Sequence, residues 1–168
     1  TETDVIHTGS DTIDNLLLNA LHAHNEKDYE TAVRIYSDIL AYQPEDHIAA
    51  VIHAHRGMAR FALGSHQEAI DDFTHTIQLS PQTTKAYYYR GVVYHALDHQ
   101  DEALSDLSRC LEFDPYHVES RIARARLYRD MHDWDAARAD CEMALRLEPD
   151  NPTVQQLYQE LKEETKHQ

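Results

Sequence analysis

An internal repeat covers most of this chain and sets the strongest limit on its fold. An alanine, a larger residue four positions later and a proline recur as Ala32-x3-Tyr36 with Pro44, Ala69-x3-Phe73 with Pro81, Ala103-x3-Leu107 with Pro115, and Ala137-x3-Cys141 with Pro149. The steps between the alanines are 37, 34 and 34 residues. A period of this length is typical of stacked helix pairs, in which each repeat contacts its neighbours, and not of a single globular core.

Each repeat is predicted to hold two helices, because apolar residues recur at helical spacing. In the third repeat, the helices are expected over 86–96 and 100–112, with stripes formed by Tyr87, Gly91 and Tyr94 and by Ala103, Leu107 and Leu111. A small residue recurs in the middle of each first helix, at Ala20, Gly57, Gly91 and Ala125. Because glycine weakens a helix, we expect these positions to allow close approach of a neighbouring helix.

This pattern resembles the tetratricopeptide repeat (TPR) family, whose units read aromatic-x2-Leu-Gly-x2-Tyr, then Ala-x3-Phe, then Pro. Tyr87-x2-Arg90-Gly91-x2-Tyr94, with Ala103-x3-Leu107 and Pro115, carries the match best. The resemblance implies an all-α, right-handed α-solenoid of stacked antiparallel helix pairs, a TPR superhelix. It divides the chain into a polar N-terminal tail at 1–12, four units at 13–46, 50–83, 84–117 and 118–151, and a C-terminal capping helix at 152–168.

Three arginines stand where the family's pattern has leucine, and each precedes an aspartate by 16 residues. The pairs are Arg56 and Asp72, Arg90 and Asp106, and Arg124 and Asp140. The first repeat has Asn19 and Ile35 at the matching places, so both partners are absent together. This joint pattern predicts structural ion pairs between helices, within a repeat or across the next interface. Repeat two also departs from the pattern by having His53 and Arg60 in place of aromatic residues.

Two further segments have specific expectations. The three extra residues of the first step lie between Pro44 and Gly57, and we expect a first helix about one turn longer, capped by Asp46, in preference to a loop bulge. The end of the chain is predicted to be a helix with Asn151 as its cap and Pro152 in its first turn. Its apolar stripe is Val154, Leu157, Tyr158 and Leu161.

Composition argues against several classes of partner. The net charge of −15 would repel nucleic acid and anionic membranes, so neither is expected as a partner. The sequence has no apolar run of membrane-spanning length and no secretory signal, which predicts a cytoplasmic protein. It begins at Thr1, which fits methionine removal, a cleaved tag or a fragment of a longer protein. Cys110 and Cys141 are expected to be buried and reduced.

The family resemblance implies that the first helices line a concave groove and the second helices form an outer wall. Over 47–62, 84–97 and 118–130, the first helices hold eight Lys or Arg and two acids, although the whole chain is acidic. The groove is therefore expected to change from apolar at its N-terminal end to basic at its C-terminal end. The predicted groove residues are Leu17, Leu21, His24, His55, Met58, Phe61, Lys85, Tyr88, Tyr89, Val92, His95, Ile122, Arg126 and Arg129.

Apolar and aromatic side chains beside arginine are typical of a recognition surface. The sequence therefore predicts a non-catalytic module that binds a peptide or helix of a partner protein. An apolar anchor is expected near Met58 and Phe61, and an acidic group near Lys85, Arg126 and Arg129. The alternative for these side chains is packing against neighbouring repeats or the capping helix. One alternative function is a structural scaffold that associates with other copies of itself as a homo-oligomer. The other is a docking arm of a larger multidomain protein.

Other functions find little support in the sequence. Many TPR domains bind the C-terminal carboxylate of Hsp70 or Hsp90 with a Lys/Asn clamp; here the matching positions hold Leu17, Leu21, His55, Lys85 and Tyr89, of which Lys85 alone fits. The chain has 13 histidines. A metal site using His24, His55 or His95 is weighed against solvated imidazoles and not favoured, because no HExxH, CxxC or compact cluster occurs. Without a nucleophile–base pair or phosphate loop, no enzyme activity, cofactor or metal is predicted.

Overall fold

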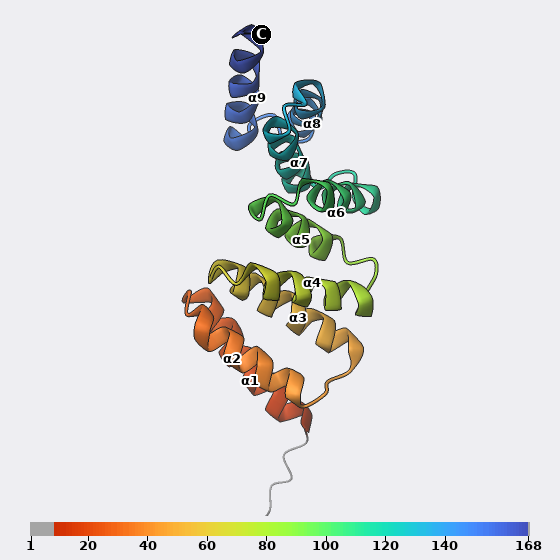
Figure 1. Cartoon of the computed structure of the whole chain (residues 1–168). Helices are drawn as coiled ribbons and strands as arrows, with labels where there is room; N and C mark the ends of the chain where they lie inside the picture. Colours follow the sequence, from red (N-terminus) through yellow and green to blue (C-terminus); the bar gives the residue numbers. More distant parts are fainter. Residues whose placement is uncertain (1–8, 168) are drawn as a thin grey trace, which may run out of the picture. The chain divides into compact units, whose positions relative to one another are not determined.

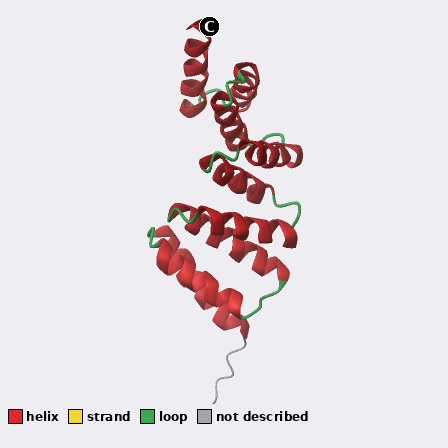
Figure 2. Cartoon of the chain, in the orientation of Figure 1, coloured by secondary structure: helices red, strands yellow, loops and turns green. Residues whose placement is uncertain are grey.

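The computed structural model describes residues 9–167 and consists there of helices joined by short turns (Figures 1 and 2). The chain forms two compact units, an N-terminal unit that ends at Thr83 and a C-terminal unit that begins at Thr84. Each unit contains two helix pairs, and the C-terminal unit also contains the last helix. The all-α arrangement of stacked helix pairs expected from the repeat is therefore confirmed.

The N-terminal unit comprises α1 (Gly9–Asn25), α2 (Tyr29–Ala41), α3 (Asp46–Ala62) and α4 (His66–Leu79). Each helix packs on the next one along the chain. The core between the first three helices is built around Tyr36, Ile39 and Ile52, which are fully buried. Helix α1 begins inside the stretch expected as a polar tail, and residues 1–8 of that predicted tail lie outside the described part of the chain.

Helix α3 accounts for the longer first step of the repeat. It has 17 residues, whereas the equivalent helices α5 and α7 have 13, so the prediction of an additional turn is confirmed. The predicted cap was wrong: Asp46 is the first helical residue, and Glu45 occupies the N-cap position without a side-chain hydrogen bond. The additional residues extend the start of the helix and do not form a loop bulge.

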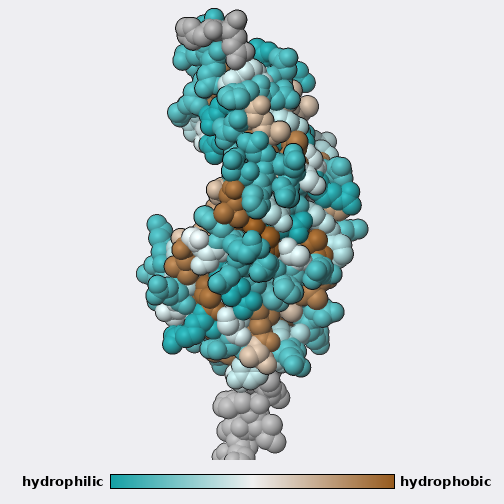
Figure 3. Space-filling model, viewed as in Figure 1, coloured by the Kyte–Doolittle hydropathy of each residue, from teal (hydrophilic) through white to brown (hydrophobic). Residues whose placement is uncertain are grey.

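The C-terminal unit comprises α5 (Thr84–Ala96), α6 (Gln100–Phe113), α7 (Val118–Asp130), α8 (Trp134–Leu147), α9 (Pro152–Glu164) and the short 3₁₀ helix η1 (Thr165–His167). Successive helices pack together, and α7 also contacts both α5 and α9. These two contacts bring the first helices of the repeats and the last helix side by side. Hydrophilic side chains dominate the visible surface of this unit (Figure 3).

Helix α9 begins where the sequence places its cap. The side-chain oxygen of Asn151 accepts hydrogen bonds from the backbone N–H groups of Thr153 (3.0 Å) and Val154 (3.2 Å), and Pro152 opens the helix. Three of the four predicted stripe residues, Val154, Leu157 and Leu161, are buried against the core that contains Cys141. The helix thus closes the apolar face of the preceding pair α7–α8.

The turns within the four helix pairs share the same backbone geometry. One residue in each of these four turns has a positive φ: Lys27 (62°), Gly64 (80°), Asp98 (61°) and His132 (60°). The residue after each of them donates its backbone N–H to a carbonyl five residues earlier, as in Asp133 to Tyr128 at 2.8 Å. This Schellman-type ending satisfies a free carbonyl of the first helix and reverses the chain.

The helices of a pair approach closely at the predicted small residues. A Cβ atom placed on Gly91 would lie 2.9 Å from Cγ of Leu107, and one on Gly57 would lie 2.9 Å from a ring carbon of Phe73. Both distances are shorter than a van der Waals contact. The prediction that these glycines permit close helix packing is therefore confirmed.

Candidate partner-binding groove

The structure brings each predicted arginine and aspartate together within one repeat. Arg124 donates from Nε and Nη2 to the two carboxylate oxygens of Asp140, at 2.7 and 2.8 Å. Arg90 holds Asp106 in the same way, at 2.7 and 2.8 Å. In repeat two, Nε and Nη2 of Arg56 reach the carboxylate of Asp72 at 3.0 and 2.8 Å. The three aspartates are buried, so these bidentate pairs belong to the packing between the helices.

Two of these arginines, Arg56 and Arg124, also reach the preceding repeat. Nη1 of Arg56 donates to Ser37 Oγ on α2 at 3.0 Å, and Nη1 of Arg124 donates to Ser108 Oγ on α6 at 3.1 Å. One period later, 34 residues on, the equivalent positions hold Tyr158 and Glu142, whose side chains share a 3.1 Å hydrogen bond. A hydrogen bond thus joins the second helix of a repeat to the next helix at each of these three places.

In repeat two, the residues that replace the aromatics of the family pattern, His53 and Arg60, both contact Asp72. His53 Nδ1 lies 2.8 Å from Asp72, and Nη1 of Arg60 lies 2.7 Å from the same carboxylate. Burial alone would raise the pKa of Asp72, but hydrogen bonds from His53 and Arg56 and the charges of Arg56 and Arg60 lower it overall. The two residues that replace aromatics are therefore additional ligands of the buried carboxylate. The sequence contained a sign of this cluster, because polar residues stand at both aromatic positions of repeat two, but that conclusion was not drawn from the sequence.

Four predicted groove residues of the N-terminal unit are half-buried on its first helices. Leu17 and Leu21 lie on α1, and Leu17 packs against the core. Met58 and Phe61 lie on α3, where the Phe61 ring is 5.4 Å from that of His66. These residues contribute apolar surface, but much of it already contacts the protein itself.

The two predicted histidines of this unit form part of an aromatic cluster. The rings of His24 and His55 are 6.2 Å apart, and His55 stacks on Tyr36 at 5.9 Å. Burial lowers the pKa of His24 and raises that of Tyr36 to about 12. Both side chains are thus neutral at pH 7, and the cluster joins α1, α2 and α3.

In the C-terminal unit, α5, α7 and the start of α9 line a cavity of about 370 Å³. It brings together five predicted groove residues: Tyr88, Val92, His95, Ile122 and Arg126. The rest of its lining is Glu119, Ala123, Asn151 and Thr153. Burial is the main cause that raises the pKa of Tyr88, so its phenol is a neutral hydrogen-bonding group.

A second cavity of about 420 Å³ adjoins the first, with which it shares Arg126 and Thr153. We call the two cavities together the C-terminal groove. Arg129 and α9 complete the lining of the second cavity, through Pro152, Gln156, Leu157 and Glu160. Sequence reasoning missed the contribution of α9. The signal was present, because Thr153, Gln156 and Glu160 follow Glu119, Ile122 and Arg126 by one 34-residue period.

A network of one histidine–carboxylate hydrogen bond and two ion pairs lies beside this groove. His95 Nε2 on α5 lies 2.8 Å from Asp130 Oδ2 on α7, and Asp130 Oδ1 lies 3.5 Å from Arg129 Nε. Arg129 Nη1 then reaches Glu160 Oε2 on α9 at 3.2 Å. The predicted alternative, packing against the capping helix, therefore describes Arg129 better than a cation open to a partner.

The other predicted basic residues differ in their surroundings. Arg126 is exposed between the two cavities, and no residue of the described chain forms a hydrogen bond or ion pair with it. Lys85 is exposed at the start of α5 and lines neither cavity. Tyr89 lies next to the groove, with its ring 5.1 Å from that of Tyr88. Arg126 is thus the cation best placed to meet a bound molecule.

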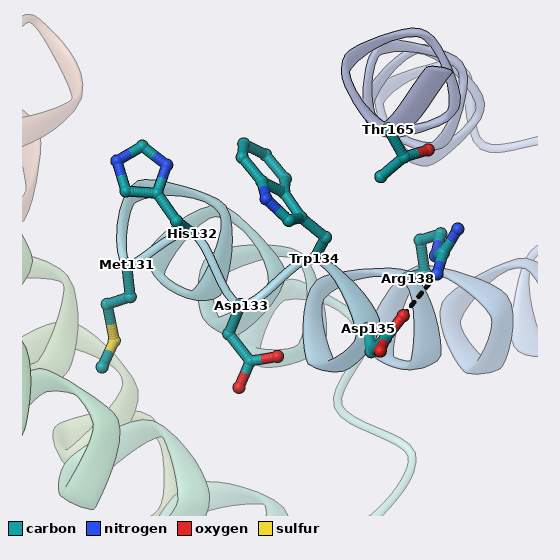
Figure 4. Close-up of a pocket in the computed structure, with 7 residues that line it drawn as sticks. All are labelled: Met131, His132, Asp133, Trp134, Asp135, Arg138 and Thr165. Atoms are coloured by element: carbon teal, nitrogen blue, oxygen red, sulfur yellow. Dashed lines mark hydrogen bonds and ion pairs between the residues drawn. The ribbon is translucent and has the colours of Figure 1, made fainter. Parts of the chain in front are cut away.

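A further hollow of about 590 Å³ lies at the turn between α7 and α8 and is lined in part by Thr165 of η1 (Figure 4). The rings of His132 and Trp134 point to the same side, 5.5 Å apart, and Asp133 points to the other. Arg138 pairs with Asp135 on α8. Because Asp133 already caps α8, this hollow offers few uncommitted polar groups.

No group of three or more potential metal ligands occurs among the described residues. Within the same part of the chain, no helix is both long and apolar enough to cross a membrane. Cys110 and Cys141 are buried free thiols, and burial is the main cause that raises the pKa of both, to about 11 for Cys141. Their thiolates are therefore scarce at pH 7.

Comparisons with known proteins agree with this architecture. Residues 55–118 match the sequence model of the tetratricopeptide repeat. No curated protein sequence matches the chain significantly. Among solved structures, the Arabidopsis OM64 TPR domain is 22% identical with a TM-score of 0.69, over 71% of this chain and 98% of that chain.

Two other solved structures extend the comparison. The second TPR domain of human RPAP3, in complex with the HSP70 peptide SGPTIEEVD, is 22% identical with a TM-score of 0.66, over 70% of this chain and 98% of that chain. A crystal structure of MamA is 18% identical with a TM-score of 0.80, over 92% of this chain and 82% of that chain. Residues 55–118 thus match the tetratricopeptide repeat, and the helix pairs share the fold of these solved structures.

Proposed function

We propose that this protein is a non-catalytic protein-interaction module, and that it binds a peptide or helix of a partner in the C-terminal groove. The observation that carries the proposal is the pair of adjoining cavities along α5, α7 and α9, with an exposed arginine between them. Much of their lining is made by the first helices α5 and α7, the elements for which the family resemblance implies a binding role, and α9 supplies the rest.

The lining offers two kinds of contact. Tyr88, Val92 and Ile122 present half-buried apolar surface that an aliphatic or aromatic side chain of a partner would cover. Arg126 presents a guanidinium group suited to bidentate binding of a carboxylate. We therefore propose a bound segment with an apolar side chain next to an acidic one. The predicted apolar anchor at Met58 and Phe61 belongs to the N-terminal unit and stays a separate prediction.

The structural relatives support protein partners as a class, because the RPAP3 domain binds a peptide of HSP70. The same ligand is not proposed here. The positions that would form a carboxylate clamp hold Leu17, Leu21, His55, Lys85 and Tyr89, and Lys85 alone has the required chemistry. The partner is thus expected to be recognised by side chains of an internal segment and not chiefly by its C-terminal carboxylate.

A capture experiment with charge-matched variants tests this proposal. The wild-type protein, Arg126→Glu and Arg146→Glu are used as baits in native lysate, and bound proteins are identified by mass spectrometry. Arg146 is exposed on the outer helix α8, so its reversal changes the net charge equally without touching the groove. We expect a protein that is retained by wild type and Arg146→Glu and lost with Arg126→Glu. Partners that both variants retain equally would contradict the proposal.

A further inference from the structure

The acidic groups of the C-terminal groove are distributed unevenly around its two arginines. Arg129 has Asp130 on its own helix and Glu160 on α9 within ion-pair distance, at 3.5 and 3.2 Å. Two carboxylates thus lie within ion-pair distance of one guanidinium, so the charge of Arg129 is already compensated within the protein. Arg126, one turn earlier on α7, has no ion-pair partner among the described residues.

Two hydrogen bonds orient the Glu160 carboxylate in this position. Its Oε2 accepts from Arg129, and its Oε1 accepts from Nε2 of Gln156 at 2.9 Å. Gln156 and Glu160 are four residues apart on α9, so the helix itself orients the carboxylate towards α7. A ligand that needs Arg129 must therefore displace an oriented carboxylate of the protein.

The two arginines are close enough to distinguish partners by their number of acids. Arg126 and Arg129 are three residues apart on one helix, which places their Cβ atoms about 5–6 Å apart. Acidic residues at neighbouring positions of a bound segment would reach both arginines at once. When Glu160 is present, one acidic residue of the bound segment can pair with Arg126. The carboxylates of Asp130 and Glu160 repel a second acidic residue near Arg129.

We propose that Glu160 is a specificity-determining residue of this groove. Its carboxylate pairs with the guanidinium of Arg129, so Arg126 alone is left to bind a carboxylate of the partner. The preferred partner is therefore a segment with one acidic residue, at Arg126, beside an apolar side chain in the cavity of Tyr88, Val92 and Ile122. Segments with two adjacent acids gain nothing from the second one. This inference rests on the proposed function, because it describes the ligand of the same groove.

The test is a selection from a random peptide library on the whole protein. The best single-acid peptide is then synthesised with and without a second acid next to the first, and both affinities are measured on wild type, Glu160→Gln and Glu163→Gln. Glu163 is an exposed residue of α9 that lines neither cavity, so its replacement gives the same charge change as a matched control.

On wild type and Glu163→Gln, we expect the second acid to leave affinity unchanged or to lower it. On Glu160→Gln, the second acid should raise affinity about two- to fivefold, as expected for one partly exposed ion pair. An equal gain from the second acid on all three proteins would overturn the inference while the groove proposal stands. Selected peptides whose binding is unaffected by Val92→Glu, or a selection that enriches no peptide, would overturn both.

Discussion

Arg124 and Asp140 form a two-bond ion pair across the α7–α8 helix pair, with Nε–Oδ2 and Nη2–Oδ1 distances of 2.7 and 2.8 Å. Arg90 and Asp106 reproduce these distances in the preceding repeat. The aspartates are only 4% and 5% exposed, so the carboxylates have exchanged water for guanidinium groups. Arginine stands here where the family pattern has leucine, so the packing of these helix pairs depends on a charge.

Removal of the carboxylate at this position should be costly. Asp140→Asn leaves the partly buried Arg124, and Arg121 at 3.4 Å from the same carboxylate, without this countercharge. We expect the free energy of unfolding to fall by about 3–5 kcal/mol. Asp135→Asn on the same helix removes an exposed charge and should cost about 0–1 kcal/mol. Urea unfolding followed by circular dichroism compares the two. Equal stability of both variants would mean that the pair contributes little to the packing.

Acid should weaken the N-terminal unit through Asp72. Burial opposes the charged form, but the contacts with His53, Arg56 and Arg60 prevail and the folded-state pKa lies below the ordinary value. A carboxyl group whose pKa is depressed by folding contributes stability above its unfolded pKa, about 3.9, and loses it as the pH falls through the folded pKa. We expect the unfolding free energy to decline below about pH 4.

Asp72→Asn provides the control for that decline. The variant should be less stable than wild type at pH 7, and the difference should shrink as the pH is lowered, because the neutral amide resembles the protonated acid. The comparison uses denaturant unfolding between neutral and acidic pH. A constant difference at every pH would show that the charge of Asp72 is not what the unit depends on.

The left-handed residue of each helix–helix turn gives a third prediction. Gly64 has φ of 80°. A Cβ there is strained by the backbone conformation, and Gly64→Ala should cost about 1–2 kcal/mol. Lys27→Ala is the matched control, because Lys27 already carries a Cβ at φ of 62°. Thermal melts of both variants check the difference, and a melting temperature of Gly64→Ala equal to that of Lys27→Ala would contradict it.

The fold could be predicted from the sequence because the same residue pattern recurs in four repeats. Helix pairs, the cap at Asn151 and the close approach at Gly57 and Gly91 all depend on contacts within one period, so the spacing of residue types reveals them. The ion pair between Arg90 and Asp106 could be predicted for the same reason, because its 16-residue spacing recurs in three repeats. Local regularity, repeated in register, carries this information.

The site was less predictable because it depends on contacts between periods. The pairing of Arg129 with Glu160 joins residues 31 positions apart and requires the register of α9 against α7, which composition and stripe analysis did not supply. Treating α9 only as a solvating cap therefore left an arginine apparently open. Extending the 34-residue period one step further would have placed Glu160 beside the groove.

The most direct test of the account locates a bound partner on the surface. A photo-crosslinking amino acid is placed at Glu119, which is exposed and lines the C-terminal groove, or at Met143 on the outer helix α8. Each protein is irradiated in native lysate, and crosslinked proteins are identified by mass spectrometry. We predict a protein crosslinked from position 119 and not from position 143. A partner crosslinked from position 143 alone would place the working surface on the outer helices and contradict the account.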